Sequence, residues 1–332
     1  MKATSLSNTL SCASLGALDY MPPLRTHTAQ WQQWGPAVLD LSRNWRTRLS
    51  ERFPRRHVEI AAAMDPVEGI NLTFAASHVG SGGRGTATTR WLLTMEHRTK
   101  GKLLGILARA CARGAHFLDI GSNIGFYGMM AASLGCKVHF FDMQCACATA
   151  VADALLANGL QRHAWIHPVG VSDQPREFPV DAGNCNGRYP QSRLVKHSAM
   201  ATSGSQKLSG LGRTVPLVQL LPIETLTKGP DNGVAQTIAK VDVEGNELSV
   251  LRGLLPYLER HLIAHLIVEV TTGYGFYEKL GVSRHDVAET IVRIMQFGYT
   301  LTDIRSNTRH SNATIRHFFK SSNTQVDFHL AL

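Results

Sequence analysis

Apolar residues in the second half of the chain fall into short runs separated by stripes at helical spacing. Runs at 116–120, 137–142 and 165–171 have the length and composition of buried strands. Between the last two runs, apolar residues recur every three or four positions, and Asn158-Gly159 marks the end of that helix. The alternation predicts a mostly parallel sheet with helices on both faces.

The same alternation continues towards the C-terminus. Ser283, followed by Asp286, predicts the start of a helix that closes at Gly298. A leucine stripe over residues 248–258 predicts another helix. Four more strands are expected, at 238–243, 261–270, 299–304 and 325–332.

Two regions interrupt this regular pattern. Residues 1–99 look irregular, and we interpret them as an N-terminal extension that is a cap or partly disordered. Its Ser/Thr-rich, acid-poor start also fits an organelle transit peptide. Residues 100–332 form the expected domain, with a flexible insertion around 174–213 that is rich in Gly, Ser, Pro and Asn.

The stretch FLDIGSNIGFYG, residues 117–128, is an apolar strand followed by a glycine turn and a helix. A dinucleotide loop needs G-x-G-x-x-G, whereas the glycines here are Gly121, Gly125 and Gly128, with Asn123 between them. Asp119 would place negative charge beside a diphosphate. The loop therefore favours a cationic ligand without phosphate, and S-adenosylmethionine fits this description.

Two further carboxylates extend this interpretation. Asp142 closes the second strand, where it can accept hydrogen bonds from the two hydroxyls of a ribose. Asp173 follows the third expected strand and is placed to accept from an adenine amino group, or else it is an ordinary turn residue.

The fourth strand carries KVDVEGNE, residues 240–247. Asp242 and Glu244 are two positions apart and would share one face of an extended strand. Carboxylates at the carboxyl end of a central strand lie where open sheets bind ligands. We interpret these two as functional, and Glu247 as a first-turn helix acid.

The loop at 117–128, KVDVEGNELSVLRG at 240–253 and LIVEV at 266–270 together resemble the FkbM-type methyltransferases. The resemblance covers roughly residues 104–270. It implies a class I S-adenosylmethionine fold, with a seven-stranded sheet whose last strand is antiparallel, and O-methylation of a hydroxyl on a small molecule or sugar.

The resemblance also implies roles for individual residues. It assigns Asp119, Gly121, Asn123 and Gly125 to the methionine end of the cofactor and Asp142 to the ribose. The remaining two residues, Asp242 and Glu244, are implied to lie beside the transferring methyl group.

A neutral alcohol is a poor nucleophile, so a base near its proton accelerates methyl transfer. Asp242 or Glu244 is the expected base, with Glu269 and His197 as weaker candidates. The carboxylates could instead hold a divalent metal ion that lowers the pKa of the acceptor.

Net charge keeps a second function open. The formal charge of the 332 residues is +9, which favours a nucleic-acid partner and hence an RNA methyltransferase. The fourth strand lacks the Asn/Asp-Pro-Pro-aromatic motif of amine methylation, and no RNA-binding module is recognisable. A catalytically inactive protein that binds the cofactor and acts through interactions is the third interpretation.

The six cysteines show no disulfide-framework spacing, which predicts reduced thiols and a cytoplasmic protein. Cys145-Ala-Cys147 lacks the spacing of a zinc site, so these cysteines are interpreted as small structural residues. No apolar run approaches the ~18 residues of a membrane span.

Overall fold

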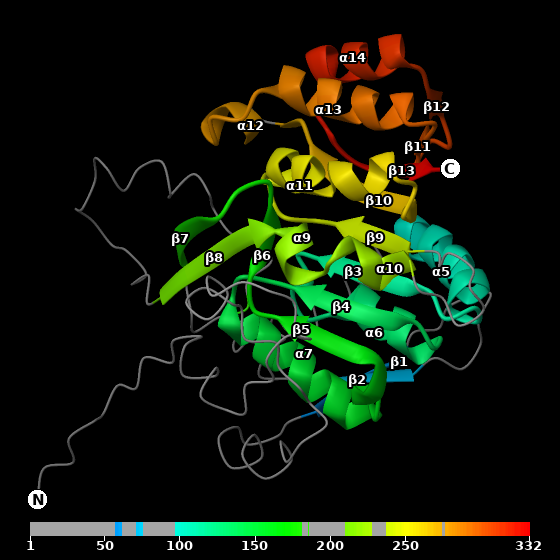
Figure 1. Cartoon of the computed structure of the whole chain (residues 1–332), viewed down its shortest axis with the longest axis vertical. Helices are drawn as coiled ribbons and strands as arrows, with labels where there is room; N and C mark the ends of the chain where they lie inside the picture. Colours follow the sequence, from blue (N-terminus) through cyan, green and yellow to red (C-terminus); the bar gives the residue numbers. More distant parts are fainter. Residues whose placement is uncertain are drawn as a thin grey trace, which may run out of the picture.

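The computed structural model describes residues 57–61, 71–75, 97–180, 185, 210–227, 237–273 and 276–332. A sheet in the order β12-β11-β13-β10-β9-β3-β4-β5 runs through its centre (Figure 1). In chain order its strands are β3 (His116–Ile120), β4 (Lys137–Phe141), β5 (Ala164–His167), β9 (Thr237–Val241), β10 (Ile263–Thr271), β11 (Thr300–Asp303), β12 (Arg309–His310) and β13 (Gln325–Ala331).

Strand directions confirm the α/β fold that the sequence predicted. The β5, β4, β3, β9 and β10 strands are mutually parallel, whereas β13 is antiparallel to both of its neighbours, β10 and β11. The described sheet has eight strands where seven were expected, because the two-residue β12 pairs with β11 at the edge.

Helices cover both faces of the sheet, and each face has its own apolar core. One core contains α5, α6 and α7, and the other contains α11, α13 and α14. The larger helices are α5 (His97–Cys111), α6 (Phe126–Ser133), α7 (Cys145–Asn158), α11 (Glu247–Glu259), α13 (Arg284–Gln296) and α14 (Asn312–Ser321). The shorter ones are η2 (Gln161–His163), α9 (Leu217–Leu220), α10 (Ile223–Thr227) and α12 (Phe276–Lys279).

The predicted helix ends are confirmed where capping residues marked them. Gly159 ends α7 in a left-handed conformation, with φ of 69°. The Ser283 hydroxyl accepts from the Asp286 N–H at the start of α13. The sequence analysis missed α14, although Ile315 and Phe319 are buried four residues apart and Ser311 caps its start.

The expected third strand, 165–171, is wrong in its second half. β5 ends at His167, and the Val169 N–H turns back to the His167 carbonyl at 2.7 Å. Pro168 between them has no N–H to donate to the ladder. The chain then enters β6 (Gly170–Ser172), which belongs to a separate sheet with β7 (Arg176–Val180) and β8 (Gly210–Pro216).

The domain boundary expected at residue 100 stays a prediction. Within the irregular first 99 residues, the structure describes an antiparallel pair, β1 (His57–Ala61) and β2 (Asn71–Ala75), and the start of α5. Most of the expected insertion, 174–213, lies outside the described residues.

The cysteines contradict the prediction of reduced thiols. Cys111 at the end of α5 is bonded to Cys136 just before β4, and Cys147 in α7 is bonded to Cys185. The sequence analysis was wrong because the partners are 25 and 38 residues apart and only the fold brings them together.

Removal of the buried Cys111–Cys136 bond should destabilise the protein. The double substitution Cys111→Ala, Cys136→Ala should lower the free energy of unfolding by about 3 kcal/mol, because the bond closes a loop of the unfolded chain. Urea unfolding of the oxidised wild type and the variant measures the difference. Reduction of the wild type also breaks Cys147–Cys185, so the reduced protein should be at least as destabilised as the variant. Equal stability of the variant and the oxidised wild type would contradict the bond.

Candidate active site

The loop after β3 turns at two glycines. Gly121 and Gly125 both have φ of 82°, and Asn123 between them has φ of 50°. The Gly121 N–H donates to the Phe141 carbonyl at 2.9 Å, which ties the loop to the end of β4. A Cβ atom on Gly121 would lie 1.8 Å from the Asp242 carbonyl oxygen. Glycine thus allows both the conformation and the close approach of the loop to β9.

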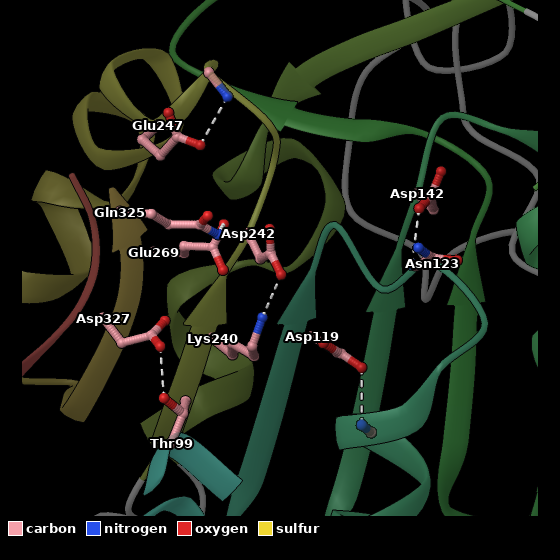
Figure 2. Close-up of polar contacts among 12 residues, drawn as sticks. Thr99, Asp119, Asn123, Asp142, Lys240, Asp242, Glu247, Glu269, Gln325 and Asp327 are labelled. Carbon is pink, nitrogen blue, oxygen red and sulfur yellow. Dashed lines mark hydrogen bonds and ion pairs between the residues drawn. The ribbon is translucent and has the colours of Figure 1, made fainter. Parts of the chain in front are cut away.

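Asp119 stabilises this turn from within the sheet. It lies in β3, is 2% exposed, and accepts a hydrogen bond from the Gly128 N–H at 2.8 Å (Figure 2). Burial raises the pKa of Asp119 to about 7, although the Lys240 ammonium and the Gly128 hydrogen bond lower it. Its contact with the methionine end of a cofactor stays a prediction.

Asp142 and Asn123 lie together at the end of β4, as Figure 2 shows. One Asp142 oxygen accepts from the Asn123 N–H at 2.9 Å and the other from the Gln144 N–H at 2.8 Å. Burial raises the pKa of Asp142 to about 6, against the lowering effect of these two donors. Each oxygen keeps a second lone pair, so the predicted ribose contact remains open to test.

Asp173 has a different setting from the one expected. It follows β6 in the three-stranded sheet, and the Ser172 hydroxyl lies 3.2 Å from its carboxylate. The backbone there packs against α11, since a Cβ on Gly253 would lie 2.5 Å from the Ser172 carbonyl oxygen. The premise for an adenine contact, a position directly after the third strand of the main sheet, is therefore wrong.

The β9 strand ends at Val241, earlier than expected. The Asp242 N–H still donates to the Ile120 carbonyl at 3.0 Å, but Glu244 has φ of 51° and Gly245 has φ of 104°. The prediction that Asp242 and Glu244 share one face of an extended strand is therefore wrong, because the backbone turns between them.

Asp242 forms a short ion pair with Lys240. The Lys240 Nζ lies 2.7 Å from an Asp242 carboxylate oxygen. The lysine side chain is 4% exposed and the aspartate side chain 24%. Lys240 thus supplies its charge from the interior, while the carboxylate lies nearer the surface.

Glu269 and Asp327 are register partners on β10 and β13, beside this pair (Figure 2). The Gln325 side chain donates to Glu269 at 2.5 Å, and the Thr99 hydroxyl donates to Asp327 at 2.5 Å. Burial, followed by the Asp242 charge, raises the pKa of Glu269 far above its usual range. Burial also raises the pKa of Asp327. The raised pKa makes the ionised form of Glu269 less available at neutral pH, and its place as a weaker candidate for the base stays a prediction.

Glu247 is a first-turn helix acid, as the sequence predicted, but its burial was not foreseen. It lies in the first turn of α11 and is 3% exposed. It accepts from the Gly245 N–H at 2.8 Å and from the Tyr277 hydroxyl at 3.3 Å. Burial raises its pKa to about 7. Glu247 therefore fixes the turn after Asp242 from beneath.

Other candidates are not placed by the structure. His197 lies outside the described residues. Within the described ranges, no three His, Cys, Asp or Glu side chains are grouped as metal ligands, and no helix is long and apolar enough to cross a membrane.

The described residues suit the cofactor that the sequence indicated. The Gly121 to Gly125 turn brings backbone close to the ends of β3 and β9, where a side chain would fill the space. Carboxyl groups at the ends of β3 and β4 complement a positively charged amino acid end and ribose hydroxyls. Asp119, Asn123 and Asp142 are the residues that would hold it.

Similar solved structures are methyltransferases, at low identity. The bifunctional kinase-methyltransferase WbdD is 13% identical, with a TM-score of 0.35 over 72% of this chain, and only 39% of WbdD is covered. A geranyl diphosphate methyltransferase with bound S-adenosylmethionine is 12% identical, with a TM-score of 0.36, covering 78% of this chain and 94% of that one. A putative rRNA methylase from Clostridium thermocellum is 11% identical, with a TM-score of 0.36, covering 70% of this chain and 94% of that one. Scores this low carry no argument about the acceptor.

The comparison of sequences is more decisive. No curated protein matches this chain. The model of the methyltransferase FkbM domain matches residues 119–305, which is more than half of the chain and includes the glycine loop, the Lys240–Asp242 pair and Glu269. The chain therefore belongs to the FkbM methyltransferase family and is an S-adenosylmethionine-dependent enzyme.

Proposed function

We propose that this methyltransferase methylates a hydroxyl group on a small molecule or a sugar, with Asp242 as the base. The observation that supports this most directly is the Lys240–Asp242 ion pair. It provides a charged carboxylate, 24% exposed, at the carboxyl end of β9 and against the glycine loop. A carboxylate in that position can accept the proton of an alcohol.

Methyl transfer requires an activated methyl group, a positioned acceptor and a base. When bound, S-adenosylmethionine supplies an electrophilic methyl group on a positively charged sulfur. Asp242 would accept a hydrogen bond from the acceptor hydroxyl and take up its proton as that methyl group is transferred. Positioning the acceptor in line contributes about 7–11 kcal/mol in favourable cases, and a base contributes about 10²–10⁴-fold.

Neighbouring carboxyl groups fit the recognition of hydroxyls. A protonated Glu269 can donate a hydrogen bond to a hydroxyl oxygen, and Asp327 lies opposite it on β13. Glu244, in the turn after Asp242, is retained as the second candidate for the base. Sugars and polyols present the alternating donors and acceptors that such a set of side chains binds.

The net charge of +9 still favours a nucleic-acid acceptor as the second candidate. Asp242, 24% exposed beside the glycine loop, argues against it, because its carboxylate would repel the phosphates of a polyanion. An inactive cofactor-binding protein is the less favoured alternative, since the Lys240–Asp242 pair and the glycine turn are both intact.

The two disulfide bonds also bear on the cellular compartment in which the enzyme works. Disulfides are typical of oxidising compartments and rare in the cytoplasm, where thiols are kept reduced. The Cys111–Cys136 and Cys147–Cys185 bonds therefore favour an oxidising compartment over the cytoplasmic location expected from the sequence.

Transfer of label identifies the acceptor class. The full-length protein is incubated with methyl-labelled S-adenosylmethionine and separated fractions of cell extract: small metabolites, glycans, RNA and proteins. Label in the metabolite or glycan fraction, stable to mild base as an ether is, is the expected result. Label in RNA that falls steeply with added salt would support the second candidate instead.

A further inference from the structure

Lys240 is a buried cation that the chemistry of the proposed base does not itself require. Its ammonium lies 2.7 Å from Asp242 and 4.5 Å from the centre of the Tyr127 ring. Tyr127 belongs to the first turn of α6, directly after the glycine loop, and is 6% exposed. One lysine thus contacts an element that shapes the cofactor loop and the carboxylate on the acceptor side.

Carboxyl groups approach Lys240 from four strands. Asp119 of β3 is its register partner, and Asp242 follows directly after the end of β9. Glu269 of β10 and Asp327 of β13 also experience its charge, which lowers the pKa of each. Figure 2 shows Lys240 in the middle of this group, between Asp119 on one side and Asp327 on the other.

Burial makes this charge necessary. Several ionised carboxyl groups in one poorly hydrated region repel each other, and each loses hydration. A cation on an aromatic ring, at the distance found here, is held without access to water. With a lysine side chain only 4% exposed, the charge also has little freedom to move away.

We propose that Lys240 is a positioning residue for methyl transfer: its ammonium, seated on the Tyr127 ring, fixes the Asp242 carboxylate and balances the carboxyl groups on both the cofactor and the acceptor side. The proposal concerns a role for Lys240, and its Asp242 part rests on the proposed function. The effect on Asp119 does not depend on the identity of the acceptor.

The charges that face Asp119 define the measurable consequence. Lys240 and the Gly128 N–H lower its pKa, whereas burial, Asp242 and Asp142 raise it, with a result of about 7. The ionised form of Asp119 attracts a cationic cofactor, so binding should weaken as the pH falls through this value. Loss of Lys240 removes the largest lowering effect, and the midpoint of the binding profile should then rise.

Calorimetry with sinefungin, a stable cationic analogue of the cofactor, tests this without an acceptor. The dissociation constant is measured from about pH 5.5 to 9 for the wild type and for Lys240→Met, and the midpoint should move up by about one pH unit. Lys240→Arg keeps the charge and should restore most of the wild-type midpoint. An unchanged midpoint in a folded Lys240→Met protein would overturn the proposal.

A matched control is available on the neighbouring strand. Lys137→Met makes the same chemical change in β4, at the opposite end of the strand from Asp142, and should leave the midpoint where it is. If Lys240→Met does not fold, the pH dependence of sinefungin binding is measured on Lys240→Gln, which removes the charge but keeps a hydrogen-bond donor for Asp242. Absence of label in every extract fraction would count against the proposed function and not against the role of Lys240. The sinefungin titration uses no acceptor, so its result does not depend on the labelling experiment.

Discussion

Asp242→Asn should reduce kcat/KM for methyl transfer by about 10²–10³-fold, while sinefungin binding at pH 8 changes by less than about threefold. The amide keeps the shape of the side chain but cannot accept the proton of the acceptor hydroxyl. It also weakens the contact with the buried Lys240 ammonium, 2.7 Å away, so thermal unfolding must be recorded alongside. The rate is measured with the labelled fraction as acceptor.

Glu244→Gln provides the matched control for this prediction. It makes the same carboxylate-to-amide change two residues later, in the turn where Glu244 has φ of 51°. If Asp242 is the base, Glu244→Gln should retain at least about a tenth of the wild-type rate. A larger loss in Glu244→Gln than in Asp242→Asn would reverse the assignment of the base.

The fold was predictable because the strands and helices carry strong local signals. Buried strands such as β3 and β4 are short apolar runs, and Gly159 and Ser283 mark helix ends with local chemistry. Where one residue interrupts the run, the signal fails, as at Pro168 between β5 and β6. The α14 helix was missed although its apolar residues have helical spacing, because its ten residues bury only two side chains and so few positions do not distinguish a short helix from a loop.

Site residues were predictable where sequence neighbours are also neighbours in space. Asp119, Gly121 and Asn123 lie within five residues of one another, at the end of β3 and in the loop that follows it. The Glu269–Asp327 contact was not predictable, because it depends on the register of strands 58 residues apart. The cysteine pairs are hidden in the sequence for the same reason.

Adding a Cβ atom at position 121 is the most direct test of how closely the glycine loop packs against Asp242. Gly121 has φ of 82°, and an added Cβ would meet the Asp242 carbonyl oxygen at 1.8 Å and the Asp242 carbonyl carbon at 2.7 Å. Both atoms are backbone, so no side chain can move aside. Either β9 shifts away from the loop or the loop leaves its position, and both changes move Asp242.

Gly121→Ala should therefore lower the free energy of unfolding by about 2–4 kcal/mol and weaken sinefungin binding by at least about tenfold. Gly159→Ala isolates the cost of backbone conformation alone, because Gly159 has φ of 69° but nothing lies within 4 Å of its added Cβ. That control should cost only about 1 kcal/mol and leave binding unchanged. Denaturant unfolding and calorimetry on the two variants separate the effects. Equal losses in both would mean that the loop does not pack against Asp242 as closely as the structure indicates.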